Sequence, residues 1–367
     1  MNPVASRTYT SKNIPTCNGV KVILASGASG GHIFPALAFL EKALENPKCQ
    51  ALLILPKSCR IKNIIPAGFK IEYVSLPGEN LVDSVKGVLS CLGLVFKFHP
   101  DVVIGFGTIV SFPVVMLSWF LRAKTIIHEQ NVFPGKANQV LAYFADKIAV
   151  SFSQSKIYFK NNTSKLALTG NPLRKGLIRI EKNTARQVFG FTPDKFTVLV
   201  SGGSQASHKI NLEFFKAVGL LRDRTSLQVI HLCGQKDFAF LKRGYVDLAV
   251  TAAVYSFYEP MQFAYSACDL AVSRAGATSI AEIIYFQIPA ILVPYPYAAG
   301  HQSANARILS EEGSAVVIKD EDLAAEPLKQ KLEDYLGGNV ALRQAQAGFN
   351  RLKQDNAAQR LVKEAFS

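Results

Sequence analysis

The amino-acid sequence predicts an α/β protein with two Rossmann-like, doubly wound domains. The chain has 367 residues, which is enough for two hydrophobic cores and too long for a single one. A short apolar run at residues 20–26 leads into a glycine-rich turn and a helical pattern, and residues 196–201 begin the same succession again. A strand, a glycine loop and a helix open a doubly wound sheet, so each half of the chain is expected to contain one.

Short apolar runs alternate with helical patterns in both halves, and this alternation is typical of parallel sheets. In the first half, further strands are expected at 51–55, 71–75, 102–105, 124–128, 147–150 and 165–168. In the second half, they are expected at 227–232, 249–254, 270–272, 290–293 and 315–318.

The domain boundaries follow from the same pattern. Residues 170–174 contain a glycine and a proline where the first series of strands ends, so the domains are expected at 20–170 and 171–349. Residues 1–19 are polar and are interpreted as a loose extension. The C-terminal helical segment, 350–367, is a candidate to complete the first domain.

The net charge of +14 is concentrated in the first half of the chain. Residues 1–172 carry 18 basic and 8 acidic side chains, whereas 173–367 carry 23 and 19. Such an excess favours anionic partners, which include phosphates, acidic lipids and nucleic acids. The most apolar stretch without a charge, 109–121, has 13 residues, fewer than the ~20 that cross a bilayer. The six cysteines show no spacing typical of a zinc site or a disulfide framework, and a reducing cytosol is the simplest setting.

The first candidate site is the glycine loop that follows the first strand. In an open parallel sheet, ligands bind beyond the carboxyl ends of the strands. Here Ser29, Gly30 and Gly31 precede His32 at the start of a predicted helix. Amides at a helix start bind anions, and a neutral imidazole accepts a proton. His32 could instead cap the helix or satisfy a core hydrogen bond, but the neighbouring glycines favour a functional role.

The second candidate site is a run of polar residues that ends a buried strand. His128, Glu129 and Asn131 follow the apolar residues 125–127 directly. Polar side chains in such a place need hydrogen-bond partners. The hydroxyls of a sugar would supply them, and so would the loops of the domain itself.

The third candidate site follows the first strand of the second half. Ser204 and Gln205 come after two glycines and can offer a hydroxyl and amides to a phosphate. The segment lacks the complete glycine fingerprint of dinucleotide sites and the lysine of a P-loop. NAD binding and ATP hydrolysis therefore lose support.

The fourth candidate site is a turn of small residues after strand 270–272. Small residues let a ligand approach the backbone closely. Glu282 lies on the following helix among apolar neighbours, which favours a buried role such as binding both hydroxyls of a ribose. The polar and small residues of this turn are Arg274, Gly276, Ala277 and Thr278.

A fifth loop, after strand 290–293, contains His301 and Gln302, which can bond sugar hydroxyls. Asp320 and Asp322 resemble the metal-binding DxD pair of another class of transferase. They precede a predicted helix, so we interpret them as N-capping residues.

These loops, in this order, resemble the MurG family, the N-acetylglucosaminyltransferases that act on lipid-linked N-acetylmuramyl-pentapeptide in bacterial cell-wall synthesis. The resemblance runs over nearly the whole chain from residue 20 onward. It is carried by segments 30–35, 128–131, 170–174, 202–205 and 274–277, together with Glu282.

The resemblance implies a GT-B fold, in which two Rossmann-like domains face each other across a cleft, and an inverting transfer that needs no cofactor and no metal. It implies that the second domain holds UDP-GlcNAc, with Glu282 at the ribose and Ser204 near the diphosphate. Arg174, Arg274, Ala277 and Gln302 would line the same site. The first domain would hold the undecaprenyl-pyrophosphoryl acceptor. His32 is the first candidate for the general base, and His128 and Glu129 are the alternatives.

The resemblance also implies a peripheral protein at the cytoplasmic face of the inner membrane, with cell-wall synthesis proteins as candidate partners and no nucleic acid. Residues 109–121 with Arg122 and Lys124 are the candidate contact with an anionic membrane surface. Three other functions stay open: a diacylglycerol glycosyltransferase, a UDP-sugar 2-epimerase and a non-catalytic scaffold of the cell-wall machinery.

Four residues depart from the family pattern. Ala28 and Ala206 stand where glycine is usual, and Gly300 occupies a position that is commonly polar. The segment 105–109, which ends at Ile109, replaces a glycine-rich stretch with a tyrosine. Ala206 is expected to narrow the room for a phosphate. The departures at Ala28 and Ile109 make the acceptor end atypical.

Overall fold

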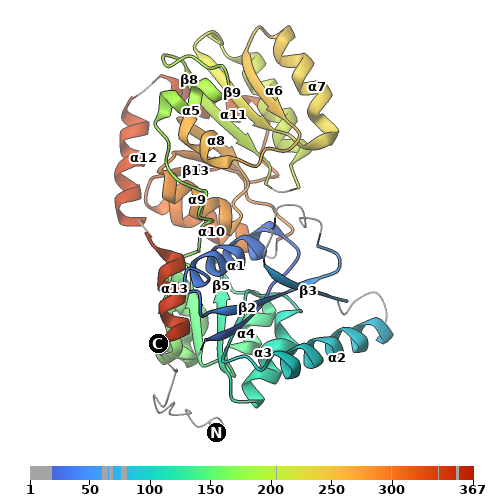
Figure 1. Ribbon diagram of the computed structural model, residues 1–367. Coiled ribbons are helices and arrows are strands. Elements are labelled where there is room, and N and C mark those ends of the chain that lie inside the picture. Colours follow the sequence, from blue (N-terminus) through green and yellow to red (C-terminus); the bar gives the residue numbers. More distant parts are fainter. Residues whose placement is uncertain are drawn as a thin grey trace. The chain divides into compact units, whose positions relative to one another are not determined.

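The computed structural model describes residues 19–59, 65, 69–75, 81–203, 205–298, 300–337, 339–352 and 355–367. The chain divides into two compact units (Figure 1). Unit 1 comprises Met1–Arg174 with Asn356–Ser367, and unit 2 comprises Lys175–Asp355. The expected extension at residues 1–19 lies outside the described residues except for Gly19.

Unit 1 contains a sheet whose described strands run in the order β3-β2-β1-β4-β5-β6-β7, with each neighbouring pair parallel. The segment η2 is 3-10 helical and is kinked at Phe159 and Asn162. In chain order, the elements of this unit are β1 (Lys21–Ala25), α1 (Gly30–Ala43), β2 (Gln50–Pro56), β3 (Lys70–Val74), α2 (Leu81–Phe98), β4 (Val102–Gly105), α3 (Ser111–Phe120), β5 (Lys124–Glu129), α4 (Lys136–Leu141), β6 (Lys147–Val150), η2 (Ser153–Lys165), β7 (Leu166–Leu168) and α13 (Ala357–Phe366).

The central strand β1 is buried on both faces. Val22 and Leu24 pack into one core with α1 and α13, while Ile23 and Ala25 pack into a second core with α2, α3 and α4. Because side chains alternate along a strand, a continuous apolar strand with helices on both faces is the arrangement of a doubly wound sheet. The α/β fold class predicted from the sequence is therefore confirmed.

The C-terminal helical segment is broken. Helix α12 (Asn339–Leu352) belongs to unit 2, and Asn356 has a left-handed φ of 63° before α13 begins. Helix α13 packs on α1 in unit 1, where the rings of Phe39 and Phe366 lie 6.4 Å apart. Lys124 Nζ donates to the carbonyl oxygens of Glu364 and Ser367 at 2.6 and 2.8 Å, so its charge lies at the end of α13.

Unit 2 contains a second parallel sheet, in the order β10-β9-β8-β11-β12-β13 among the described strands. Val198 and Val200 of β8 pack with Ile210 and Phe214 into a buried core. In chain order, the elements of this unit are α5 (Lys182–Val188), β8 (Phe196–Ser201), α6 (His208–Leu220), β9 (Leu227–Leu232), α7 (Gly234–Asp247), β10 (Thr251–Tyr255), α8 (Met261–Ala267), β11 (Leu270–Ser273), α9 (Ala277–Phe286), β12 (Ala290–Leu292), α10 (His301–Glu311), β13 (Ala315–Val317), α11 (Ala325–Leu336) and α12.

Both sheets reverse their winding beside the central strand. The chain moves outward from β1 to β2 and β3, then returns to place β4 on the other side of β1. Unit 2 repeats this with β8, β9 and β10, followed by β11. The loops after β1 and β4, and those after β8 and β11, therefore leave neighbouring strands in opposite directions. Such a switch point is where ligands bind in open α/β sheets.

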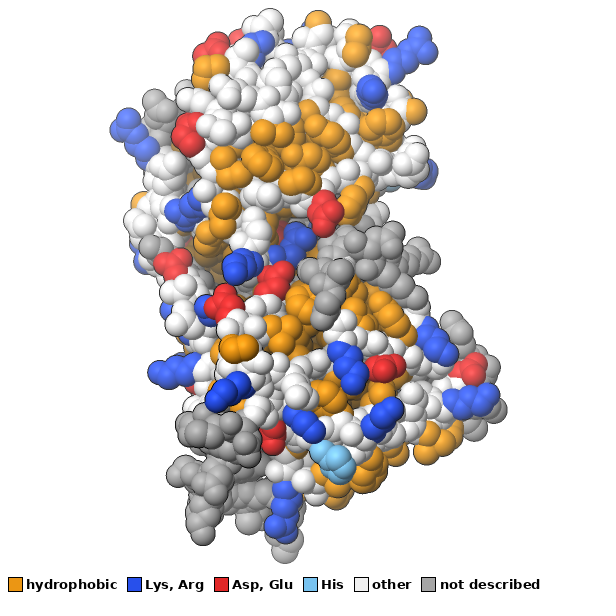
Figure 2. Space-filling view, in the orientation of Figure 1, with side chains coloured by type: hydrophobic (Ala, Val, Ile, Leu, Met, Phe, Trp, Pro, Cys, Tyr) orange, Lys and Arg blue, Asp and Glu red, His pale blue; other side chains and the backbone are white. Residues whose placement is uncertain are grey.

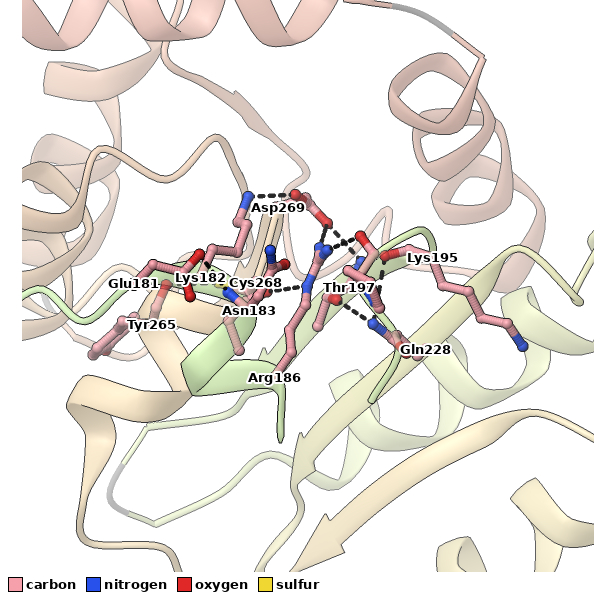
Figure 3. Close-up of polar contacts among 12 residues, drawn as sticks. Glu181, Lys182, Asn183, Arg186, Lys195, Thr197, Gln228, Tyr265, Cys268 and Asp269 are labelled. Carbon is pink, nitrogen blue, oxygen red and sulfur yellow. Dashed lines mark hydrogen bonds and ion pairs between the residues drawn. The ribbon is translucent and has the colours of Figure 1, made fainter. Parts of the chain in front are cut away.

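A polar cluster lies at the opposite edge of the unit 2 sheet. The guanidinium of Arg186, only 5% exposed, points toward Asp269, to which it donates at 2.6 Å (Figure 3). The same carboxylate accepts from the amide of Thr197 and from Lys182. Arg186 also donates to the carbonyl of Ala267, so the cluster fastens α5 to the amino-terminal ends of β8 and β11.

We expect Arg186→Met to lower the free energy of unfolding by about 3 kcal/mol, because it leaves the Asp269 carboxylate without its buried partner. Lys182→Met is the matched control, since Lys182 pairs with the same carboxylate but is 45% exposed. Its cost is expected to be below about 1 kcal/mol. Urea denaturation of both variants measures the difference. Equal losses of unfolding free energy would show that burial does not determine how much this ion pair stabilises the fold.

Candidate active site

In unit 1 the switch point brings the loop after β1 against the loop after β4. A Cβ built on Gly27 would lie 2.4 Å from the Cγ2 of Thr108. Gly107 has a φ of 78°, and a Cβ there would lie 3.3 Å from the imidazole of His32. A side chain at Gly27 would collide with Thr108 of the opposite loop, and Gly107 adopts a left-handed conformation that is strained for residues with a side chain. The loops therefore approach closely enough for the second to position the histidine of the first.

His32 lies in the first turn of α1, after Ser29 as N-cap residue and after Gly30 and Gly31. Its Nδ1 lies 2.7 Å from the carbonyl oxygen of Phe106. A carbonyl oxygen only accepts, so Nδ1 carries the proton and the Nε2 of the neutral ring keeps its lone pair. This tautomer is the one that a general base requires.

Gln130 fixes the same tautomer independently. Its amide nitrogen donates to the carbonyl oxygens of Phe106 and His128 and to Nδ1 of His128. All three are acceptors, so the amide oxygen is the atom that faces Nδ1 of His32, at 3.1 Å. Gln130 is buried and acts as a positioning residue for His32. The polar run at 128–131 signalled it, but the candidate residues chosen from that run omitted it.

His128 is fully buried, and both of its ring nitrogens are engaged. Nδ1 accepts from Gln130, and Nε2 donates to the carbonyl of Gly170 at 3.1 Å. Burial lowers the pKa of His128 to about 4, so the ring is neutral at physiological pH. The geometry therefore does not support His128 as a base. It joins the end of β5 to the segment that ends unit 1.

The carboxylate of Glu129 is buried and accepts four hydrogen bonds. Its donors are the backbone and side-chain amides of Asn131, the backbone amide of Gly135 and the side chain of Asn138. These donors occupy both carboxylate oxygens with contacts inside the unit. Glu129 organises the loop and holds Asn131 in place, and the geometry does not support it as a base either.

Arg174 lies in unit 1, although the resemblance assigned it to the donor site of the second domain. Its guanidinium stacks over the ring of Phe34, 4.2 Å from the centroid. Phe34 is on α1, two residues after His32. The structure therefore groups Arg174 with the His32 loop.

In unit 2, the loop after β8 leads into α6, whose N-cap is Ser207. Ser204 lies outside the described residues, and Gln205 is exposed. Ala206 has a left-handed φ of 57°, a conformation that glycine adopts without strain. Ala206 Cβ also lies close to Gly234, which itself has a φ of 76°. The departure from glycine at 206 is thus accommodated at a cost in backbone strain.

Arg274 is half-buried, and its guanidinium is engaged by groups of its own unit. It forms an ion pair with Asp320 at 2.5 Å and donates to the hydroxyl of Ser207 at 2.9 Å. It also donates to the carbonyl of Val293. Arg274 therefore fastens the start of α6 to the loops after β11, β12 and β13.

The interpretation of Asp320 and Asp322 as N-caps is wrong. The N-cap of α11 is Ala324, which makes no side-chain capping bond. Asp320 instead pairs with Arg274 and, at 3.7 Å, with Lys209 in the first turn of α6. Its carboxylate balances two cations beside the glycine loop.

The start of α9 is formed by the small residues expected from the sequence. Gly276 is the N-cap, and Ala277 and Thr278 form the first turn. Glu282 lies one turn further and is buried, with its Oε2 accepting from the hydroxyl of Tyr265 at 2.7 Å. The carboxylate thus has a fixed orientation on the helix that begins at the switch point.

The loop after β12 is tied to the loop after β11 by Gln302. Its side-chain oxygen accepts from the amides of Ala275 and Tyr295, at 3.1 and 2.9 Å. His301 begins α10 directly after Gly300, whose φ of 81° explains why glycine occupies this usually polar position. Arg274 and Gln302 therefore lie at the starts of α6 and α9, and Glu282 lies on α9 about one turn further along.

A buried polar chain lies behind α6. His231 contacts the hydroxyl of Tyr245 at 2.8 Å and the side chain of Asn211 at 3.2 Å. Asn211 donates to Asp237, whose other oxygen contacts the imidazole of His208 at 2.7 Å. Burial lowers the pKa of His231 to about 3. This series of hydrogen-bonded side chains fixes α6 against β9 and α7.

Within the described ranges, no three His, Cys, Asp or Glu side chains converge as a metal site would require. None of the helices in the same ranges is long and apolar enough to cross a bilayer.

The two doubly wound units, each with a glycine loop and a helix start at its switch point, match the two domains of a glycosyltransferase. The glycosyltransferase family 28 N-terminal domain matches residues 22–150, and the family 28 C-terminal domain matches residues 197–361. Within this class, the chain belongs to the family of UDP-N-acetylglucosamine–N-acetylmuramyl-(pentapeptide) pyrophosphoryl-undecaprenol N-acetylglucosamine transferases. The resemblance seen in the sequence is confirmed.

The chain is 35% identical to the family member from Desulforamulus reducens, over 94% of this chain and 97% of that one. The member from Halothermothrix orenii is 34% identical with the same coverage. Among solved structures, MurG of Acinetobacter baumannii is similar with a TM-score of 0.75 and 25% identity, covering 94% of this chain and 99% of that chain. A UDP-N-acetylglucosamine 2-epimerase from Listeria monocytogenes has a TM-score of 0.71 at 12% identity, which shows a shared fold alone.

We expect acid to destabilise the protein through His128 and His231. The unfolded chain binds protons below a pKa near 6.5, whereas the folded rings stay neutral down to pKa values of about 4 and about 3. The free energy of unfolding should therefore fall as the pH drops from about 6.5 to about 4, by roughly 1.4 kcal/mol per pH unit for each histidine.

Urea denaturation between pH 7 and pH 5 measures this slope. His231→Gln should reduce the slope of unfolding free energy against pH. His99→Asn, which replaces an exposed histidine, should leave that slope unchanged. A free energy of unfolding that is constant over this range would contradict the assignment.

Proposed function

We propose that this protein transfers N-acetylglucosamine from UDP-GlcNAc to the 4-hydroxyl of undecaprenyl-pyrophosphoryl-N-acetylmuramyl-pentapeptide, with inversion at the anomeric carbon. One observation carries the proposal: the similarity to relatives named for this transfer extends over both units, 94% of the chain. The donor belongs to unit 2 and the acceptor to unit 1. Peptidoglycan synthesis is the process that this reaction serves.

The reaction is a single displacement. The oxygen of the acceptor hydroxyl attacks the anomeric carbon, and the bond from that carbon to the diphosphate oxygen breaks, its electron pair leaving with UDP. The hydroxyl proton passes to Nε2 of His32. Nδ1 keeps its hydrogen bond to Phe106, and the Phe106 carbonyl and the Gln130 oxygen then stabilise the imidazolium.

The negative charge that develops on UDP needs a prearranged positive environment. The starts of α6 and α9 present backbone amides at the carboxyl edge of the unit 2 sheet. Arg274 acts mainly by clamping Ser207, the residue that begins α6. Glu282 accepts hydrogen bonds from the ribose hydroxyls. Gln302 joins the loops after β11 and β12, which border the ribose.

The acceptor is lipid-linked, and unit 1 offers a surface suited to a membrane. Leu89 is 60% exposed, and it lies on one face of α2 with the exposed side chains of Val85 and Phe96. On the neighbouring helix α3, Phe120 is also exposed, and Arg122 follows it. Figure 2 shows hydrophobic side chains among Lys and Arg on this unit.

We propose that this surface, formed by exposed apolar residues of α2 and α3 with Lys86, Lys97 and Arg122, contacts anionic lipid at the cytoplasmic face of the membrane. Lys124 is removed from the contact proposed from the sequence, because it caps the end of α13. Residues 109–121 contribute only in part, since Val114 and Val115 are buried in the core.

We expect His32→Ala to lower the turnover number at least about 100-fold, because the acceptor hydroxyl loses its proton acceptor. The affinity for UDP-GlcNAc should be unchanged, since the donor belongs to unit 2. The assay uses purified protein, radiolabelled UDP-GlcNAc and the lipid-linked acceptor, with and without a chelator. His99→Ala, at an exposed histidine of unit 1, is the matched control. Near-normal turnover in His32→Ala would remove this residue from the role of base.

We expect the double variant Leu89→Ser/Phe96→Ser to bind phosphatidylglycerol vesicles about tenfold more weakly, because two exposed apolar side chains no longer enter the bilayer surface. Co-sedimentation measures the binding. Phe240→Ser/Val246→Ser, at exposed apolar residues of unit 2, is the control. Equal binding by both double variants would place the membrane contact elsewhere.

A further inference from the structure

Glu282 is a buried carboxylate whose orientation depends on another helix. It is 6% exposed and lies on α9 among apolar residues. A carboxylate in such surroundings requires hydrogen-bond donors, because burial removes most of its hydration. The hydroxyl of Tyr265, on α8, donates to Oε2 at 2.7 Å, the short distance typical of a charge-assisted bond.

Tyr265 is itself held in place by packing. It is also 6% exposed, and its ring stacks on that of Phe286, with centroids 5.1 Å apart and planes at 25°. Phe286 lies on α9, one turn after Glu282. The same helix therefore presents both the carboxylate and the ring that fixes the direction of the tyrosine hydroxyl.

We infer that Tyr265 is a positioning residue through which Glu282 distinguishes a ribose from a 2′-deoxyribose in the donor nucleotide. The inference rests on the proposed function, in which Glu282 accepts the ribose hydroxyls. A carboxylate is planar, so fixing one oxygen fixes the direction of the other. A diol that must meet this plane loses affinity when one hydroxyl is missing, and a carboxylate free to rotate would adapt to either sugar.

A purely structural role for Tyr265 would have another consequence. Loss of packing or of general stability would weaken the binding of UDP and of 2′-deoxy-UDP to the same extent. Loss of the fixed carboxylate orientation weakens the binding of UDP selectively, because only UDP has both ribose hydroxyls to donate to Glu282. The ratio of the two dissociation constants therefore separates positioning from packing.

The test measures dissociation constants of UDP and 2′-deoxy-UDP by calorimetry for the full-length protein and four variants. We expect the wild type to prefer UDP about tenfold or more, the usual effect of a lost hydrogen bond to a charged group. Tyr265→Phe should reduce the preference to about twofold. Tyr285→Phe is the matched control, since its ring also packs on Phe286, and it should keep the wild-type ratio.

Glu282→Gln separates the inference from the proposed function. If this variant loses the preference and Tyr265→Phe retains it, Tyr265 does not position Glu282, while the ribose contact stands. If Glu282→Gln retains the full preference, the ribose contact itself is wrong, and the inference falls with it. Phe286→Leu, which removes the ring without removing the hydroxyl, should lower the ratio partially, and an unchanged ratio there would also count against positioning.

Discussion

The architecture depends on one kind of strand pairing, in which the central strand of a parallel sheet lies beside the strand to which the chain returns. The pairs are β1 with β4 and β8 with β11. Each pair places two helix-leading loops side by side at the carboxyl edge, where one loop can position the polar groups of the other. In unit 1 this contact gives His32 its tautomer through the Phe106 carbonyl. In unit 2 it lets Arg274 hold Ser207 at the start of α6.

The polar residues at these edges therefore divide into groups that can meet a substrate and groups that hold them. His32 and Glu282 each lie in a frame of buried partners, Gln130 for the first and Tyr265 for the second. The cluster of Arg186 and Asp269 lies at the other edge of the unit 2 sheet and serves stability. Such separation is expected when catalysis requires fixed dipoles and the fold must supply them in advance.

The sequence sufficed for the strands, the helices and the two glycine loops, because periodicity and glycine placement are local signals. It did not distinguish contact residues from positioning residues. His128 is engaged by Gly170, 42 residues later, and Glu129 by amides of the loop and helix that follow it, and hydrophobic periodicity reveals neither set of contacts. Lys124 likewise caps the end of α13, about 240 residues later, and no local pattern indicates this contact. The break before α13 depends on the left-handed conformation of Asn356. The helical pattern of the sequence does not indicate that conformation.

The central claim is that the switch point of unit 2, between the starts of α6 and α9, holds the donor nucleotide. A crystal structure of the protein grown with UDP tests it most directly. The account predicts the diphosphate at the amides that begin α6 and the ribose hydroxyls within hydrogen-bonding distance of the Glu282 carboxylate. Nucleotide density at the His32 loop, or at any place away from Glu282, would contradict it.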